Sequence, residues 1–214
     1  MKKMKDFFDE EAVEHDDLFV KEMGMTEFYD EVEKVLNSCE YKSSVLVLGC
    51  GSGLEIERLK FPCNVVGVDL SDKMLEVLEK KKLYDGVNLK TVCGSFLDLD
   101  FEEEKYDIVL SCYAMHHFNS EQKQKIYNKI YKCLKQGGVF INGDTLAVNR
   151  DEEDKCMADA EQAYQKENMP FASMHVDVPF CFEHEKEVLR KAGFNDVELV
   201  REWTKTKLYK CKKK

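Results

Sequence analysis

Proline and long hydrophobic runs are scarce in this sequence. Of 214 residues only 3 are proline and 11 are glycine, while 43% are hydrophobic, which excludes collagen-like and disordered chains. No stretch approaches the ~18 to 20 uninterrupted apolar residues of a membrane span, and the N-terminus lacks the apolar core of a signal peptide. We therefore expect a single folded domain that is cytoplasmic and has no membrane partner.

Paired cysteine and histidine motifs are also missing. The 9 cysteines stand singly and form no C-x-x-C pair, so we expect reduced thiols rather than disulfides or a zinc site. The 5 histidines show no metal-ligand spacing. His116 and His117 are adjacent, so on a helix or strand their side chains would point in different directions. On these grounds no metal site is expected.

Positive charge is the third shortage. The formal net charge is −10, which disfavours a general affinity for nucleic acid. The clearly basic runs at 2–5 and 210–214 lie at the two ends, where solvated tails are expected. A small-molecule partner is therefore favoured over RNA or DNA, and the sequence says nothing about oligomeric state.

From residue 41 the sequence alternates between short apolar runs and amphipathic segments. The apolar runs predict buried strands and the amphipathic segments predict helices. The expected strands are 44–48, 64–69, 89–93, 106–111 and 139–142; the expected helices are 52–60, 72–82 with Ser71 as N-cap, and 120–136 ended by Gly137-Gly138. This alternation predicts a doubly wound, parallel α/β sheet.

Three segments flank or interrupt that alternation. Residues 1–40 are acidic and predict a helical N-terminal cap. Residues 146–180 combine a charged helix with an irregular stretch, which predicts a lid insertion over one end of the sheet. Residues 181–214 predict a helix stopped by Gly193 and an antiparallel hairpin at the sheet edge. All belong to one domain whose core spans 41–145.

A glycine cluster directly after the first expected strand carries the chemistry. Gly49, Gly51 and Gly53 let the backbone turn sharply and let a ligand approach, with amide groups of the expected following helix pointing at it. Asp69 ends the second strand, where it can accept hydrogen bonds from both ribose hydroxyls. Leu54 stands where a dinucleotide signature has its third glycine, so the pattern predicts a nucleotide-type ligand other than a dinucleotide.

The G-x-G-x-G spacing resembles that of class I S-adenosylmethionine-dependent methyltransferases. Further blocks occur in the order of that family, across residues 41 to 145: Val68 to Leu75, Gly94 to Phe96, Tyr106 to Ser111, Met115 to Phe118 and Leu134 to Ile141. The resemblance implies a Rossmann-like, seven-stranded sheet that is mostly parallel, with an antiparallel C-terminal hairpin. It also implies S-adenosylmethionine as cofactor and S-adenosylhomocysteine as product.

Ten cofactor-binding residues follow from the resemblance. The glycines flank the methionine portion, Asp69 holds the ribose, two apolar side chains enclose the adenine, two residues meet its edge and two lie near the sulfonium. In that order they are Gly49, Gly51, Gly53, Asp69, Leu70, Met74, Ser95, Phe96, Ser111 and Cys112.

Two positions depart from the family pattern. Val47 stands where the family usually has an acidic residue, so a charge contact to the cofactor's ammonium from that position is missing. Ser95 stands where an aspartate commonly recognises the adenine amino group. A backbone group or the Ser95 hydroxyl is expected to substitute.

The acceptor side is less defined. Methyl transfer to a small molecule needs mainly alignment and desolvation, with a base only where the acceptor loses a proton. The catalytic residues are unknown; His116 is a candidate as base, orienting group or pocket wall, and Asp144 as a substrate or metal ligand or a solvated loop carboxylate. His175 and Tyr164 in the expected lid could face substrate or simply pack.

Three alternative functions stay open at this point. They are a non-catalytic cofactor-binding partner protein, an RNA or protein methyltransferase, and an NAD(P)-dependent enzyme on a related sheet.

Overall fold

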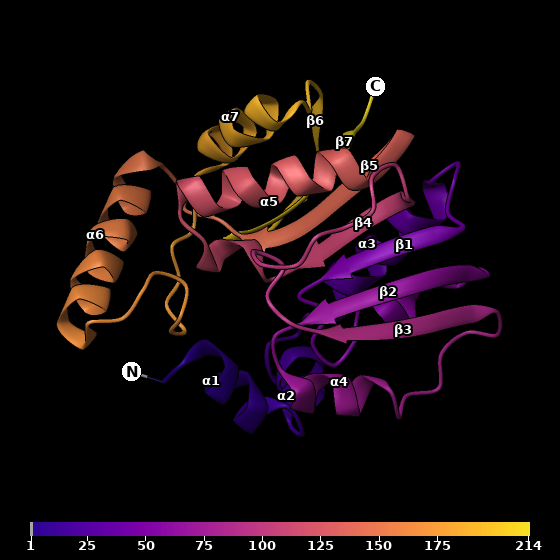
Figure 1. Ribbon diagram of the computed structural model, residues 1–214, viewed down its shortest axis with the longest axis horizontal. Coiled ribbons are helices and arrows are strands. Elements are labelled where there is room, and N and C mark those ends of the chain that lie inside the picture. Colours follow the sequence, from indigo (N-terminus) through magenta and orange to yellow (C-terminus); the bar gives the residue numbers. More distant parts are fainter. Residues whose placement is uncertain (1) are drawn as a thin grey trace.

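The structure, a computed structural model, describes residues 2–214 and is built on one seven-stranded mixed sheet (Figure 1). The strand order is β3-β2-β1-β4-β5-β7-β6. Strands β1 to β5 are parallel, β7 is antiparallel to β5, and β6 is antiparallel to β7. The strands are β1 (Ser44–Leu48), β2 (Cys63–Asp69), β3 (Val87–Cys93), β4 (Tyr106–Cys112), β5 (Leu134–Thr145), β6 (Val197–Glu202) and β7 (Thr206–Lys212). The predicted doubly wound sheet with its C-terminal hairpin is confirmed.

The helices flank both faces of this sheet. They are α1 (Met4–Glu11), α2 (His15–Asp17), α3 (Thr26–Ser38), α4 (Asp72–Leu78), α5 (Ser120–Cys133), α6 (Arg150–Glu167) and α7 (Phe182–Ala192). A π-helical turn at Leu18–Glu22 and short 3-10 turns at Ile56–Arg58 and Met115–His117 complete them. None of the helices within residues 2–214 is long and apolar enough to span a membrane. All nine cysteines are free thiols.

Two apolar clusters cover the two faces of the sheet. On one face α5 and α7 pack over β4, β5 and β7, with Tyr127, Phe140 and Phe194 fully buried. On the other face α3 packs through Val32 and Leu36, also fully buried, and lies behind the strands in Figure 1. Helix α3 is therefore part of the core, and only the N-terminal residues before it cover the end of the sheet.

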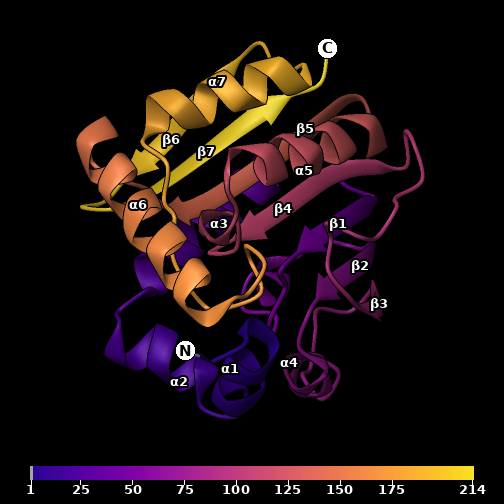
Figure 2. The same cartoon turned by 60° about the vertical axis from the view of Figure 1, so that its left-hand side comes forward.

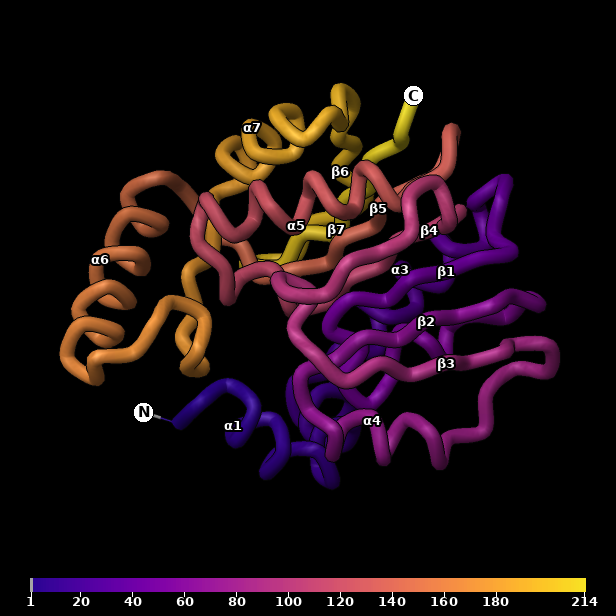
Figure 3. The backbone as a smooth tube through the Cα atoms, viewed as in Figure 1, coloured from indigo at the N-terminus to yellow at the C-terminus, as the bar shows by residue number. Residues whose placement is uncertain are grey.

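Those N-terminal residues meet the segment between α6 and α7 across the carboxyl ends of the strands (Figures 2 and 3). The backbone N–H of Met4 donates to the carbonyl of Ser173 over 2.9 Å, and Lys3 forms a β-bridge with Met174. The ring of Phe7 stacks on His175 with centroids 3.8 Å apart. Two segments from distant parts of the sequence thus form one cover.

The predicted helix over 52–60 is wrong. Only the 3-10 turn Ile56–Arg58 forms, because Gly53 has a positive φ of +86° and Leu59 is already extended. Pro62 follows closely and disfavours helical backbone before it. Helix α4 likewise ends at Leu78 rather than near residue 82, although its predicted N-cap is confirmed, since the Ser71 hydroxyl accepts from the N–H of Met74.

The predicted glycine cap at Gly137-Gly138 is also wrong. Helix α5 ends at Cys133, and β5 begins at the next residue without a loop. Gly137 has a φ of +76° within the strand, where its N–H donates to the carbonyl of Lys213. The positive φ of Gly137 therefore produces an irregularity within β5 and does not end helix α5. At Gly193, by contrast, the predicted left-handed end of α7 is confirmed by a φ of +116°.

Candidate functional site

A cavity of about 510 Å³ lies at the carboxyl ends of β1, β2 and β4, beneath the N-terminal cover. This is where ligands bind in open α/β sheets, and its size suits a nucleoside-sized ligand together with a small molecule. Of the ten predicted cofactor-binding residues, eight line it: Gly49, Gly51, Asp69, Leu70, Met74, Ser95, Phe96 and Cys112. Gly53 and Ser111 lie outside its lining.

The glycine turn is shaped by hydrogen bonds to β2 and by positive φ angles. The N–H groups of Gly49 and Cys50 both donate to the carbonyl of Val68, over 2.8 and 3.0 Å. Gly51 has a φ of +46°, and a Cβ there would point into the cavity, nearest to His15 Cε1 at 3.9 Å. A Cβ at Gly53 would instead collide with Leu78 of α4. Gly51 is therefore the glycine that leaves room for a ligand.

Asp69 closes this turn as well as facing the cavity. Its two carboxylate oxygens accept the N–H groups of Gly51 over 2.7 Å and Ser71 over 2.8 Å. Burial raises the pKa of this carboxyl above its usual value, although these hydrogen bonds oppose the shift. Each carboxylate oxygen offers a second lone pair, so Asp69 can still accept hydroxyl groups from a ligand.

The cavity lining near Asp69 also contains apolar side chains and one acidic residue, Asp98, that sequence analysis missed. Leu70, Met74 and Phe96 supply soft, flat contact surface, and all three line the cavity. The Ser95 hydroxyl accepts the N–H of Leu97 over 3.2 Å. Asp98 also lines the cavity. An aspartate three residues after Ser95, where the family often has an acid, was the signal that could have identified it.

Of the two predicted residues at the end of β4, Cys112 lines the cavity and Ser111 does not. The Ser111 hydroxyl donates to the carbonyl of Leu48 over 2.9 Å and is fully buried between strands. Cys112 lines the cavity, and burial raises the pKa of its thiol well above the usual value, so the group is a neutral thiol. Val47 is fully buried in the core below the turn.

Glu55 is a second cavity residue that sequence analysis missed. Its side chain is 4% exposed, and its Oε1 has no hydrogen-bond partner within the described residues. Burial raises the pKa of this carboxyl to about 8, and the nearby charge of Asp69 acts in the same direction. A buried carboxyl with an unpaired oxygen, on a residue that lines a cavity, is suited to meet a cation or a hydrogen-bond donor.

The N-terminal segment is fastened to the glycine turn by polar contacts. The Ser52 hydroxyl donates to Asp16 over 2.5 Å and lies 3.0 Å from His15 Nδ1. Lys81 forms an ion pair with Asp16 at 2.5 Å. These contacts place His15 and Phe19 in the lining of the cavity.

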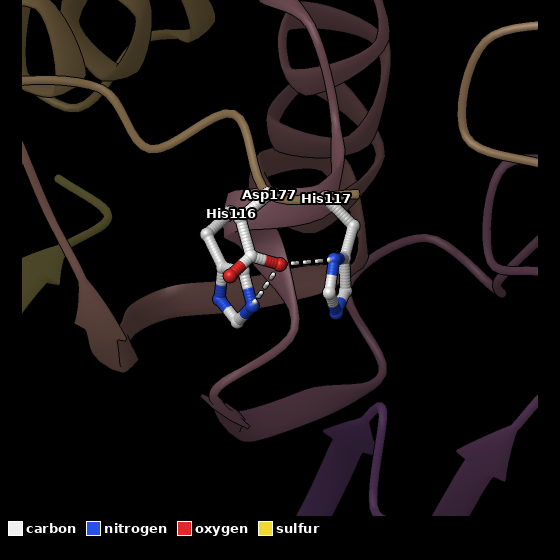
Figure 4. Close-up of side chains that lie close together, drawn as sticks. All are labelled: His116, His117 and Asp177. Carbon is white, nitrogen blue, oxygen red and sulfur yellow. Dashed lines mark ion pairs between the residues drawn. The ribbon is translucent and has the colours of Figure 1, made fainter. Parts of the chain in front are cut away.

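Four polar side chains meet beside the cavity, three of them shown in Figure 4. His116 Nδ1 donates to Asp144 Oδ1 over 2.6 Å, and Asp177 Oδ1 lies 3.5 Å from His116 Nε2 and 3.3 Å from His117 Nδ1. The expectation that the adjacent histidines point apart is wrong: in the 3-10 turn their rings lie 4.0 Å apart. The interpretation of Asp144 as a solvated loop carboxylate is also wrong, since it is fully buried.

The members of this group differ in charge state. Burial lowers the pKa of His116, but the carboxylates of Asp144 and Asp177 outweigh it and the net shift is upward. Burial together with the charge of His116 lowers the pKa of His117 to about 4. Burial raises the pKa of Asp177, yet its contacts with the imidazoles prevail and lower it to about 2. Only His117 of this group lines the cavity.

Some of the aromatic residues and histidines of the expected cap and lid line the cavity, and others do not. Phe19, Tyr29 and Phe171 line the cavity. The Tyr164 hydroxyl donates to the carbonyl of Met174 over 3.0 Å in a small separate apolar cluster, and His175 stacks on Phe7. Tyr164 and His175 therefore pack the cover and do not face the cavity.

Comparison with known proteins gives concordant matches. A family model described as a methyltransferase domain matches residues 45–138. An uncharacterized methyltransferase of Bacillus cytotoxicus is 30% identical over 194 residues, 88% of each chain. A carboxy-S-adenosyl-L-methionine synthase of Nautilia profundicola is 23% identical over 95% of this chain and 92% of its own. Among solved structures, the DhpI–SAH complex is similar in fold, with a TM-score of 0.72 at 17% identity over 96% of this chain and 93% of that one.

Proposed function

The chain belongs to the methyltransferase-domain family and is an S-adenosylmethionine-dependent methyltransferase, and from that premise we propose that it methylates a small-molecule acceptor inside the cavity. The observation that carries the proposal is the partly covered cavity of about 510 Å³. It extends from the glycine turn to His117 and is covered by both the N-terminal segment and Phe171. A concave, partly covered site of this size favours a metabolite over a nucleic acid or protein chain.

The cofactor fits the residues that are present. Gly51 keeps a side chain out of the cavity beside His15 and Met74, and Asp69 retains acceptor capacity for ribose hydroxyls. Leu70 and Met74 provide the apolar surface for adenine. We propose Asp98, which lines the cavity, rather than Ser95 for the adenine amino group, because a carboxylate is a stronger acceptor than the Ser95 hydroxyl, which already accepts the N–H of Leu97.

Glu55 supplies the charge that Val47 lacks. Glu55 lines the cavity, close in sequence to the glycine turn where the methionine portion of the cofactor would lie, and its buried Oε1 is unpaired within the described residues. An ammonium group there would favour the ionised carboxylate, because an opposite charge within a few ångströms lowers a carboxyl pKa. Cofactor binding at neutral pH would therefore release a proton from Glu55, whose pKa is about 8 without ligand.

The protein's part in the reaction is alignment and desolvation. When bound, the cofactor supplies a methyl group on a positively charged sulfur, which needs no further activation. The apolar walls and the cover strip water from the acceptor and hold it in line. His117 is the lining residue on the proposed acceptor side, and His116 and Asp144 lie behind it, with Asp144 fixing the tautomer and orientation of His116.

A second activity calls for a direct test because relatives carry the name carboxy-S-adenosyl-L-methionine synthase. A carboxylate beside the sulfonium would need a cationic partner. Among the described residues that line the cavity there is no lysine or arginine, whereas Glu55, Asp69 and Asp98 are acidic. The lining thus favours simple methyl transfer.

Mass spectrometry distinguishes methyl transfer from carboxy-S-adenosyl-L-methionine synthesis, when the protein is incubated with S-adenosylmethionine and a metabolite extract. Methyl transfer yields S-adenosylhomocysteine and an extract component that gains one methyl group. A carboxylated cofactor of higher mass would instead support the second activity. If S-adenosylmethionine neither binds by calorimetry nor is consumed, the proposal fails.

A further inference from the structure

We propose that His116, His117 and Asp177 form a binding site for a divalent transition-metal ion, with Asp144 as the residue that orients His116. The three ligand atoms all lie within 4.8 Å of one another. Figure 4 shows the Asp177 carboxylate between the two imidazole rings. The spacing of the histidines along the sequence predicted no such site.

The distances suit a metal ion better than direct hydrogen bonds. Asp177 Oδ1 lies 3.5 Å from His116 Nε2 and 3.3 Å from His117 Nδ1, whereas charge-assisted N–H···O bonds are ~2.7 to 2.9 Å long. His117 Nδ1 is also 3.5 Å from the carbonyl of Val176, again too long for a firm bond. In a tetrahedral site with bonds of ~2.0 to 2.2 Å, ligand atoms stand about 3.3 to 3.6 Å apart.

The support around His116 is that of a metal-bound imidazole. Its Nδ1–H donates to the Asp144 carboxylate over 2.6 Å, which leaves the Nε2 lone pair directed at the cluster. Metal-ligating histidines almost always donate their second ring N–H to such a group. Asp144 is fully buried, and its Oδ2 has no partner within the described chain.

The charges around the cluster call for a cation. Two carboxylates, Asp144 and Asp177, accompany two imidazoles, a set that a divalent ion would balance. Lys123 is the neighbouring lysine, and its ammonium is already paired with Glu185 at 2.7 Å. Two imidazoles and one carboxylate are a donor set typical of zinc, iron and cobalt.

The backbone holds the three ligands together. The N–H of Val178 donates to the carbonyl of His116 over 2.7 Å, which fixes the residue after Asp177 against the histidine pair. His117 belongs both to the cluster and to the cavity lining. On the proposed function, the remaining coordination position is open to the cavity and would take an oxygen or nitrogen atom of the acceptor.

Titration with metal alone tests the site. The full chain, stripped with a chelator, is titrated with Zn²⁺ by calorimetry and with Co²⁺ by visible absorption, and one ion per chain is expected. Asp177→Ala should weaken binding at least about ten-fold, and Asp144→Asn about 10- to 100-fold. Asp177 has a half-exposed side chain, so its variant should fold. Asp154→Ala, an exposed acid on α6, is the matched control and should bind as the parent does.

Two results would overturn the proposal. One is the absence of saturable Zn²⁺ and Co²⁺ binding, and the other is equal affinity in the parent and in Asp177→Ala, which would place the ion on other histidines or cysteines. S-adenosylhomocysteine binding is measured on the same preparations. If it persists while metal binding fails, the metal site is refuted and the proposed function stands.

Discussion

The two walls of the cavity are built in different ways. The wall proposed to hold the cofactor, called the cofactor-side wall, consists of three short segments, 49–55, 69–74 and 94–98, each at the carboxyl end of a strand of the parallel sheet. Its polar groups are held by bonds between close neighbours, as in the contact of Asp69 with Gly51 and Ser71. The acceptor-side wall brings together Phe8, His117 and Phe171, from three distant segments. A wall built from residues that follow strand ends can be predicted from a sequence motif. A wall built from distant segments depends on the packing of all those segments and cannot.

The strongest test of that contrast is to remove the anchor behind the acceptor-side wall. Lys123 and Glu185 are both fully buried and paired at 2.7 Å, and the Lys123 ammonium lies 3.9 Å from the ring centroid of Phe180. The hydroxyls of Tyr127 and Tyr209 also donate to Glu185. Lys123→Met should lower the free energy of unfolding by about 3 to 5 kcal/mol, because it leaves a buried carboxylate without its cation.

Chemical denaturation measures this loss. Lys125→Met, on the exposed side of the same helix, should change stability by less than about 1 kcal/mol. The double variant Lys123→Met/Glu185→Gln should recover part of the loss. If Lys123→Met is as stable as the parent, the buried pair does not anchor this wall.

On the cofactor-side wall, Gly51→Val should affect binding far more than folding. A branched side chain at a φ of +46° would enter the cavity and would cost about 1 to 2 kcal/mol of backbone strain. We expect S-adenosylhomocysteine affinity to fall at least about 100-fold by calorimetry, equivalent to ~2.8 kcal/mol. Gly24→Val is the control, because Gly24 has a φ of +67° and no atom lies within 4 Å of the point where a Cβ would stand. Unchanged affinity in Gly51→Val would place the cofactor elsewhere.

Glu55→Gln should raise the free energy of unfolding at high pH and weaken the binding of S-adenosylmethionine. The folded-state pKa of about 8 lies above the unfolded value, so Glu55 keeps a proton that the unfolded chain releases. Its contribution to stability therefore falls as pH rises from about 4.5 to 8 and is level above that range. Glu55→Gln should be more stable than the parent by about 5 kcal/mol at pH 9 and equal to it within about 0.5 kcal/mol at pH 4.5.

The same variant should bind S-adenosylmethionine about ten-fold more weakly, because it loses a charge-assisted contact. Calorimetry in buffers of different ionisation enthalpy should show release of about one proton per cofactor at pH 7 in the parent and none in Glu55→Gln. Glu103→Gln, exposed on a loop, is the control for both measurements. Equal proton release in parent and Glu55→Gln would contradict the assignment of the ammonium contact.

The smallest expected effect is in the dynamics of the cover. Residues 3–25 and 168–178 contact each other through a few bonds and one stacked ring pair, whereas α3 and β4 are deeply buried. Hydrogen exchange should be faster in both cover segments than in α3, and S-adenosylhomocysteine should slow it several-fold. Equal protection of the cover and of β4 in the free protein, unchanged by the ligand, would show that the cover is static packing.

The sequence by itself determined the alternation of strands and helices and the meeting of the glycine turn with Asp69 at a cavity. Apolar runs that need burial on both faces specify parallel strands, and a glycine turn at the end of such a strand has few other uses. Its errors at 52–60 and at Gly137 arose because a glycine with positive φ can end a helix, shape a loop or bend a strand. Which of these three roles a glycine takes depends on which carbonyl is within reach of its N–H, as the carbonyl of Lys213 is for Gly137.

Only the tertiary structure decided the rest. Glu55 became a cavity residue because the expected helix did not form, and its free oxygen follows from burial that no local pattern encodes. His116, Asp144 and Asp177 meet because β4 and β5 are neighbours in the sheet and because Val178 bonds to His116. Contacts between residues about 30 and 60 positions apart depend on the closure of the whole chain, so the spacing of residues along the sequence carries no trace of them.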